Sequence, residues 1–140
     1  MKLNKFNCEG YSDPTSYRAL TNILKEQHEI RTFRPLVYIC SPYFGDTEKN
    51  VKDAKRYCRC AFDRGYIPIA PHLFFPQFLD NSDVRERKYS MFFIDVLMGK
   101  CAQIWVFGDS ISAAMKDEIS HAKRKKFKIR CFTENCQEVV

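Results

Sequence analysis

Carboxylate side chains follow an apolar segment of this chain, where they could act on a bound ligand. Residues 104–107 form a short apolar run typical of a strand that is buried on both faces. Gly108 and Asp109 end that run with turn residues, and Ser112 is a good N-cap for a following helix that carries Glu118 in its second turn. Ligands of open parallel sheets bind beyond the carboxyl ends of the strands. Asp109 and Glu118 are therefore candidates for chemistry on a ligand; otherwise they are a turn residue and a solvated helix residue.

Other candidate groups follow the two earlier apolar segments. The loop 41–46 brings a hydroxyl and aromatic side chains directly after the apolar run 36–40. The stretch 71–80 is apolar and aromatic but too rich in proline for a helix, so it either lines a pocket for a planar ligand or packs against a helix or another subunit. His72 within it, taken alone, fits a structural role. Asp95 lies among apolar neighbours and points outward, caps a neighbour or belongs to a site.

The elements that would position these groups alternate between strands and helices. The patterns predict strands over 36–40, 66–70, 104–107 and 127–132. Between them they predict a helix that Thr47 caps and that runs to about residue 64, a helix that starts at Ser82 or Asp83 and runs to about residue 100, and a helix over 113–126. Such alternation predicts an α/β fold of three layers, with a Rossmann- or flavodoxin-like parallel sheet of four to five strands. Pro68 places the second strand at an edge or makes it irregular.

The same patterns divide the chain into three regions. Residues 1–33 are expected to form an arm and an extra N-terminal amphipathic helix that starts at Asp13 and Pro14. This helix either covers a sheet edge or serves a partner subunit. Residues 34–133 are expected to form the main domain, and residues 134–140 a tail.

Composition limits the remaining classes of function. The chain has 140 residues, which suits one domain, and a net charge of +6, which favours anionic partners. The basic run 123–126 suits a helix C-terminus, and no aromatic residues interleave with it, so nucleic acid is not the expected partner. The chain has no apolar run of about 18 residues for a membrane span, and residues 1–6 lack the long apolar core that is typical of a signal peptide. We therefore expect no membrane partner and a cytoplasmic location.

The seven cysteines fit a reducing compartment, since their number is odd and several lie in apolar segments. Cys58 and Cys60 are two apart on a predicted helix and point in different directions, which makes a poor metal clamp. Cys131 and Cys136 lack a second pair at zinc-finger spacing. No metal site is expected.

Three of these segments together resemble the nucleoside 2-deoxyribosyltransferase-like superfamily, which includes the deoxynucleoside monophosphate N-glycosidases. The segments are 37–43, 69–72 and 105–109 together with Ser112 and Glu118. The resemblance covers roughly residues 35–132 and is closest to a branch found in bacteria and their phages.

The resemblance implies an enzyme that cuts the N-glycosidic bond of a nucleoside or nucleotide and needs no cofactor. Glu118 would attack C1′, and water or a second base would release the sugar, the logic of a retaining glycosidase. Asp109 or Asp95 would orient the sugar or protonate the base. Cys40-Ser41 and Ala114 stand where the family commonly has glycine, and Asp117 is the alternative nucleophile. The substrate-binding residues implied are Tyr38, Ser41, Tyr43, His72, Phe74, Phe75, Ser112 and Met115.

Two other functions remain open on the sequence. A binding module of the same fold would sense or sequester a nucleotide without turnover. A basic protein that associates with nucleic acid is the weaker alternative. The aromatic loop, the N-terminal helix and the superfamily resemblance together favour a homo-oligomer.

Overall fold

The structure is a computed structural model that describes residues 14–139, and the chain divides into two compact units after Phe33. The first unit contributes helix α1, Pro14–Ile30. The expected N-cap at Asp13 and the expected arm lie outside the described residues. None of the helices described between residues 14 and 139 is both long and apolar enough to cross a membrane.

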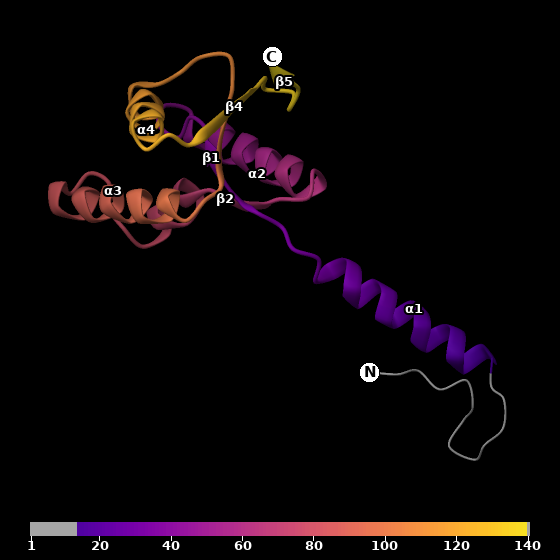
Figure 1. Cartoon of the computed structure of the whole chain (residues 1–140). Helices are drawn as coiled ribbons and strands as arrows, with labels where there is room; N and C mark the ends of the chain where they lie inside the picture. Colours follow the sequence, from indigo (N-terminus) through magenta and orange to yellow (C-terminus); the bar gives the residue numbers. More distant parts are fainter. Residues whose placement is uncertain (1–13, 140) are drawn as a thin grey trace. The chain divides into compact units, whose positions relative to one another are not determined.

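The second unit is a five-stranded sheet with helical crossovers (Figure 1). In chain order its elements are β1 (Leu36–Cys40), α2 (Thr47–Asp63), β2 (Ile67–Ile69), two 3₁₀ turns (Pro71–Leu73 and Phe75–Gln77), α3 (Val84–Gly99), β3 (Gln103–Phe107), α4 (Ala113–Arg124), β4 (Lys128–Phe132) and β5 (Glu138–Val139). The strand order is β2-β1-β3-β4-β5, and only β5 is antiparallel to its neighbour. The predicted α/β class and the edge position of the proline-containing strand are confirmed.

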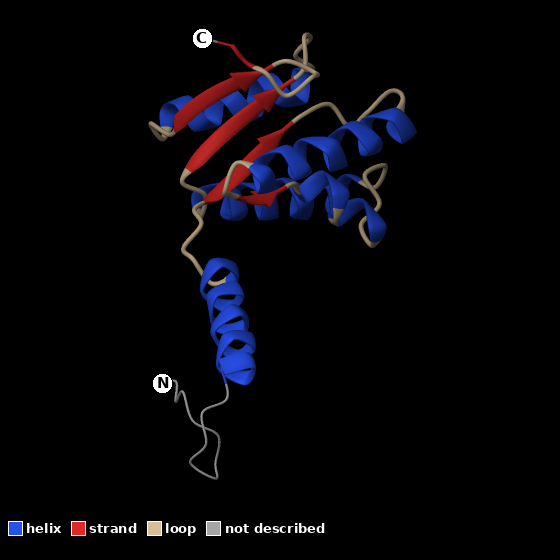
Figure 2. Ribbon diagram, turned by 90° about the vertical axis from the view of Figure 1, so that its right-hand side faces the viewer, coloured by secondary structure: helices blue, strands red, loops and turns tan. Residues whose placement is uncertain are grey.

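Alternate residues of the central strands face two separate cores. In β1, Tyr38 and Cys40 pack with residues of α3 and α4, whereas Val37 and Ile39 pack with Tyr57 of α2. This alternation follows from the two-residue repeat of a strand. Because both faces are covered, β1 and residues 104–107 of β3 are apolar, and this unit has the predicted three layers (Figure 2).

Side-chain caps fix where the helices of this unit begin. Ser112 accepts a hydrogen bond from the backbone N–H of Met115 at the start of α4, as its N-cap position predicts. Asp83 caps α3 in the same way. The prediction that Thr47 is the N-cap of α2 is wrong by one residue. Asp46 supplies the cap, and Thr47 is the first helical residue.

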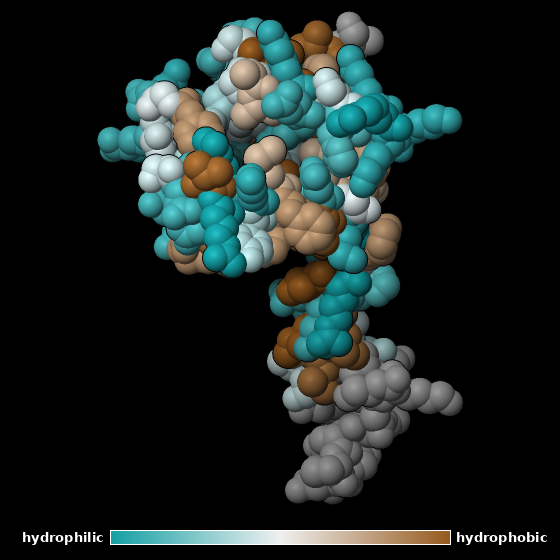
Figure 3. All heavy atoms as spheres, turned by 90° about the vertical axis from the view of Figure 1, so that its left-hand side faces the viewer, coloured by the Kyte–Doolittle hydropathy of each residue, from teal (hydrophilic) through white to brown (hydrophobic). Residues whose placement is uncertain are grey.

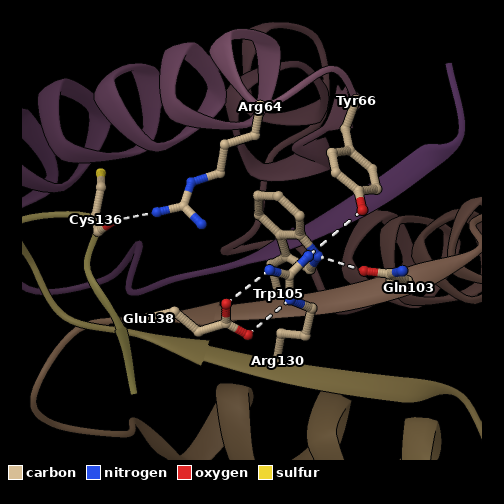
Figure 4. Close-up of polar contacts among 7 residues, drawn as sticks. All are labelled: Arg64, Tyr66, Gln103, Trp105, Arg130, Cys136 and Glu138. Atoms are coloured by element: carbon tan, nitrogen blue, oxygen red, sulfur yellow. Dashed lines mark hydrogen bonds and ion pairs between the residues drawn. The ribbon is translucent and has the colours of Figure 1, made fainter. Parts of the chain in front are cut away.

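Residues 134–140, expected to be a tail, contain the short strand β5, which pairs with β4. Arg130 holds this strand through two hydrogen bonds of 2.8 and 2.7 Å to the carboxylate of Glu138 (Figure 4). The same guanidinium lies 4.8 Å from the ring of Trp105. A bidentate ion pair that also stacks on an aromatic ring gives the two-residue strand a fixed position.

Candidate functional site

A cavity of about 480 Å³ lies between α3 and α4, beside the carboxyl ends of the parallel strands. The loop after β1 and the 3₁₀ turns after β2 form its rim, and one face of each of the two helices forms its walls. Figure 3 views the molecule from the side of α3 and α4 and shows hydrophobic side chains among hydrophilic ones on this surface. The cavity therefore lies where ligands of open α/β sheets bind.

Helix α4 directs Glu118 into this cavity. The helix begins at Ala113, after the N-cap Ser112. Its cavity-lining face carries, at helical spacing, Ala114, Met115, Glu118 and His121. Residues Ala113 and Ala114 add little bulk near the start of the helix. Glu118 thus occupies one wall of the cavity rather than a solvated helix face.

The surroundings of Glu118 favour its neutral form and yet supply donors for its charged form. Burial raises the pKa of the Glu118 carboxyl, and the negative charges of Asp95 and Asp117 raise it further. The hydroxyl of Tyr38 and the thiol of Cys40 project from β1 toward the carboxylate. Their hydrogen bonds to it lower its pKa and so oppose the effect of burial. Burial also raises the pKa of both Tyr38 and Cys40 well above their usual values, so both remain protonated donors.

At the rim, Ser41 and His72 form a second polar group. The Oγ atom of Ser41 lies 3.0 Å from Nε2 of His72. Burial lowers the pKa of His72 to about 4, so its imidazole is neutral near pH 7 and one ring nitrogen can accept a hydrogen bond. The ring of Tyr43 lies edge-on to this imidazole, with 6.1 Å between the ring centroids.

Asp95 and His121 approach each other along the cavity. Nε2 of His121 lies 3.6 Å from Oδ1 of Asp95, and it has no hydrogen-bond partner among the described residues although the atom is buried. Asp95 comes from α3 and His121 from α4, so the pair spans the two walls. Glu118 lies one turn before His121 on α4.

The structure brings together most, but not all, of the residues predicted for the site. Those that line the cavity are Ser41, Tyr43, His72, Phe75, Asp95, Ser112, Met115 and Glu118, together with the alternative nucleophile Asp117. Tyr38 is buried beneath the cavity, where its hydroxyl faces Glu118.

Two predicted residues lie elsewhere. Asp109 is exposed in the turn after β3 and does not line the cavity. Its place after a strand does not bring it to the site because the chain continues for three residues before α4 begins. Phe74 is 59% exposed and lines a separate apolar hollow beside β2 and α3.

The cavity is also lined by polar residues that no sequence motif indicates. Arg87 and Ser90 line it from α3, and His121 and Arg124 line it from α4. A helical repeat is the signal that could have found them, because Arg87 is eight residues before Asp95 and His121 is three after Glu118. Within residues 14–139, no group of three or more His, Cys, Asp and Glu side chains is placed to hold a metal ion.

Comparisons with known proteins give one family and a shared fold. The family model described as "Domain of unknown function (DUF7768)" matches residues 35–132. The chain is similar in structure to a 2-deoxyribosyltransferase from the psychrotolerant bacterium Bacillus psychrosaccharolyticus, with a TM-score of 0.61 and 13% sequence identity over 75% of this chain and 76% of the other. No curated protein matches the chain. The structural match shows that the two proteins share a fold.

Proposed function

Because the chain belongs to the family described as Domain of unknown function (DUF7768), which assigns no activity, we propose its function from the cavity and the shared fold. We propose that the protein hydrolyses the N-glycosidic bond of a nucleoside or nucleotide, or transfers its deoxyribosyl group, with Glu118 as the nucleophile. The observation that carries the proposal is the Glu118 carboxylate, which is partly buried in the wall of a cavity of about 480 Å³ beside two protonated donors.

In the proposed reaction, an oxygen of ionised Glu118 forms a bond to C1′ while the bond from C1′ to the base breaks. The electrons of that bond go to the base, which takes a proton from an acid. The deoxyribosyl ester on Glu118 is then cleaved by water, giving free sugar, or by a second base, giving a new nucleoside. The donors on Tyr38 and Cys40 stabilise the carboxylate before attack and again when it leaves.

The other cavity residues have roles that follow from their positions. Asp95 faces the cavity from α3 and is proposed to orient the sugar or to protonate the departing base. The rings of Tyr43 and Phe75 line the rim and provide flat surfaces against a base. The hydroxyls of Ser41 and Ser112 supply hydrogen bonds to the substrate at its 5′ end. Asp109 has no place in this mechanism, because it lies outside the cavity.

The shared fold supports the class of substrate. The protein to which the chain is structurally similar is described as a 2-deoxyribosyltransferase and as a biocatalyst for the synthesis of nucleosides. In the same fold, a cavity at the carboxyl ends of the strands supports a nucleoside or nucleotide as the ligand here.

The test is to incubate the full chain with a panel of deoxynucleosides, their monophosphates and nicotinamide dinucleotides, and to measure free base by chromatography. Free base from one member, lost in Glu118→Gln, is the expected result. Asp109→Asn is the matched control, since it removes an exposed carboxylate from the same strand–turn–helix segment. Asp117→Asn distinguishes the two candidate nucleophiles, because it is expected to keep activity if Glu118 is the nucleophile and to lose it if Asp117 is. Equal activity in wild type and Glu118→Gln would contradict the assignment.

A direct test of the covalent step is mass spectrometry of protein quenched during turnover. The tryptic peptide 117–123 is expected to gain one deoxyribosyl group, and fragmentation is expected to place it on Glu118 rather than Asp117. If no panel member releases base but one of them raises the melting temperature, the protein is a nucleotide-binding module instead.

We also propose that the protein is a homo-oligomer. Met91 and Phe92 on α3 and Phe44 at the rim of the cavity are 59%, 63% and 64% exposed. Large apolar side chains exposed together mark contact surfaces. Light scattering is expected to give a mass above that of one chain, and the mass of a monomer would reject this part of the proposal.

A further inference from the structure

Two cysteines outside the cavity come together from distant parts of the chain. Cys60 lies in the last turn of α2, and Cys136 lies in the turn between β4 and β5. Both are partly buried and pack on the same apolar cluster, which lies on the α2 side of the sheet. The α3–α4 cavity lies on the opposite side of the sheet, so these thiols play no part in the proposed glycosidic chemistry.

Arg64 joins the two residues. Its backbone N–H donates to the carbonyl of Cys60 at 3.1 Å, and its guanidinium donates to the carbonyl of Cys136 at 2.9 Å. The guanidinium also lies 4.9 Å from the ring of Phe132, which fixes its direction. Figure 4 shows the Cys136 sulfur pointing toward the ribbon of α2.

The backbone at Cys136 supports a defined position for this sulfur. Its φ of 62° is in the left-handed region, and its N–H bonds to the carbonyl of Thr133 at 3.0 Å. A non-glycine residue in this region is held there by its surroundings. The turn therefore presents the thiol toward α2 in one orientation, and Cys60 of α2 packs on the same apolar cluster and lies near enough to raise the pKa of Cys136.

We propose that Cys60 and Cys136 form a redox-sensitive dithiol, which a low-molecular-weight disulfide such as oxidised glutathione converts into a disulfide that staples the β4–β5 hairpin to α2. In the first step a thiolate of the pair attacks oxidised glutathione, forms a mixed disulfide and releases one glutathione thiolate. The second cysteine then attacks the protein sulfur of that mixed disulfide and releases the second glutathione. Both thiol protons go to solvent or to the released glutathione, so two thiols are oxidised and one glutathione disulfide is reduced.

The surroundings of the pair set its rate of reaction. Burial and the neighbouring thiol of Cys60 raise the pKa of Cys136 to about 11, while the guanidiniums of Arg56 and Arg64 act in the opposite direction. The thiol is therefore mostly protonated near neutral pH, and oxidation is expected to be slow there and faster in mildly alkaline buffer.

The test uses the full chain, incubated with oxidised glutathione in mildly alkaline buffer, alkylated and digested with trypsin and a glutamate-specific protease. Cleavage after Arg59 separates Cys58 from Cys60, and cleavage after Glu134 separates Cys131 from Cys136. The expected product is peptide 60–64 linked to peptide 135–138, with the loss of two hydrogen atoms. A link that joins any other pair, glutathione adducts without a link, or two unmodified thiols would overturn the proposal.

Cysteine variants and thermal unfolding complete the test. Cys60→Ser and Cys136→Ser are expected to prevent the link, whereas Cys131→Ser, which changes an exposed thiol on β4, is expected to keep it. Oxidation is expected to raise the melting temperature of the wild type by several degrees, because the link closes a long loop in the unfolded chain. The same treatment is expected to leave Cys60→Ser unchanged, and a fall in the wild-type melting temperature would overturn the stapling role.

Discussion

The fold shifts the pKa values of two glutamates in opposite directions. Glu118 is partly buried in the cavity, where desolvation raises the pKa of its carboxyl. Glu138 is exposed on β5, where the hydrogen bonds and charge of Arg130 lower its pKa. The first arrangement favours reactivity at the expense of stability, and the second contributes to stability.

Glu118→Gln is therefore expected to raise the free energy of unfolding near neutral pH. The folded protein binds the Glu118 proton more tightly than the unfolded chain does, so the wild type loses stability as the pH rises through and above the ordinary value of 4.5. The amide cannot ionise and escapes this loss. Urea unfolding at a series of pH values is expected to show the gain at neutral pH and its decline below that ordinary value. A gain independent of pH would contradict the burial of a charge.

Glu138→Gln is the control with the opposite sign. Its lowered pKa stabilises the folded state above the ordinary value of 4.5, and this contribution disappears as the pH falls through the lower folded value. The variant is therefore expected to be less stable than the wild type at neutral pH and equal to it in strong acid. If both glutamate variants shifted stability in the same direction, electrostatics would not be the cause of either shift.

His72 provides a second pH-dependent prediction. Its pKa falls from 6.5 to about 4 on burial, so below pH 6.5 the unfolded chain takes up a proton that the folded chain refuses. The wild type is expected to lose up to about 3 kcal/mol of stability from this group between those two values. His72→Gln keeps an amide near Ser41 and is expected to flatten the slope of unfolding free energy against pH in that window. Parallel slopes for the two proteins would contradict the prediction.

The sequence predicts correctly that a side chain lines the cavity where its direction follows from the periodicity of one helix or strand. Glu118 and Asp95 lie on predicted helices, and both line the cavity. Asp109 does not, because a turn residue takes its direction from the turn, which a residue pattern does not specify. Tyr38 was expected to contact substrate but faces Glu118 from below, since the alternation within β1 sends its side chain into the core between the sheet and α4.

At the scale of elements, helix caps set the positions of the cavity walls. Asp83 accepts hydrogen bonds from the backbone N–H groups of Arg85 and Glu86 and so fixes the start of α3, which carries Arg87 and Asp95. Asp83→Ala is expected to lower the free energy of unfolding by about 1 kcal/mol, because two N–H groups lose their acceptor. Asp83→Asn keeps an acceptor and is expected to lose much less. Urea unfolding distinguishes the two, and equal losses would show that the cap contributes through charge instead.

The elements were predictable where they are long and periodic. The alternation of apolar strands and amphipathic helices predicted β1 to β4 and the helices between them to within a few residues. Strand β5 was missed because two residues cannot show a period of two, and its position depends on Arg130, eight residues before Glu138. Sequence preference does not separate Asp46 from Thr47 as the cap of α2, because both residue types are good caps. The predicted cap is therefore one residue away from the observed one.

At the scale of the whole molecule, the chain divides after Phe33 into two units, and we expect only the second of them to fold when it is separated from the other. The unit from Arg34 to Val140 contains the sheet, both apolar cores and the cavity, so we expect it to fold without the residues before Arg34. Helix α1 has 17 residues, and an isolated helix of that length is marginal in water. The two units are therefore expected to respond differently when they are separated.

A chain that starts at Arg34 is expected to unfold cooperatively in urea, with a midpoint close to that of the full chain, whereas a peptide of residues 14–33 is expected to show little helix by circular dichroism. The reason is that, among the described residues, both apolar clusters of the sheet consist of residues after Arg34, whereas an isolated helix of 17 residues such as α1 is marginal in water. A shortened chain that unfolds in a broad transition would show that α1 completes the core. The shortened chain could instead keep its stability but have the mass of a monomer in light scattering while the full chain is an oligomer. That result would assign α1 to the contact between subunits rather than to the cover of a sheet edge, the two roles that the sequence predicts.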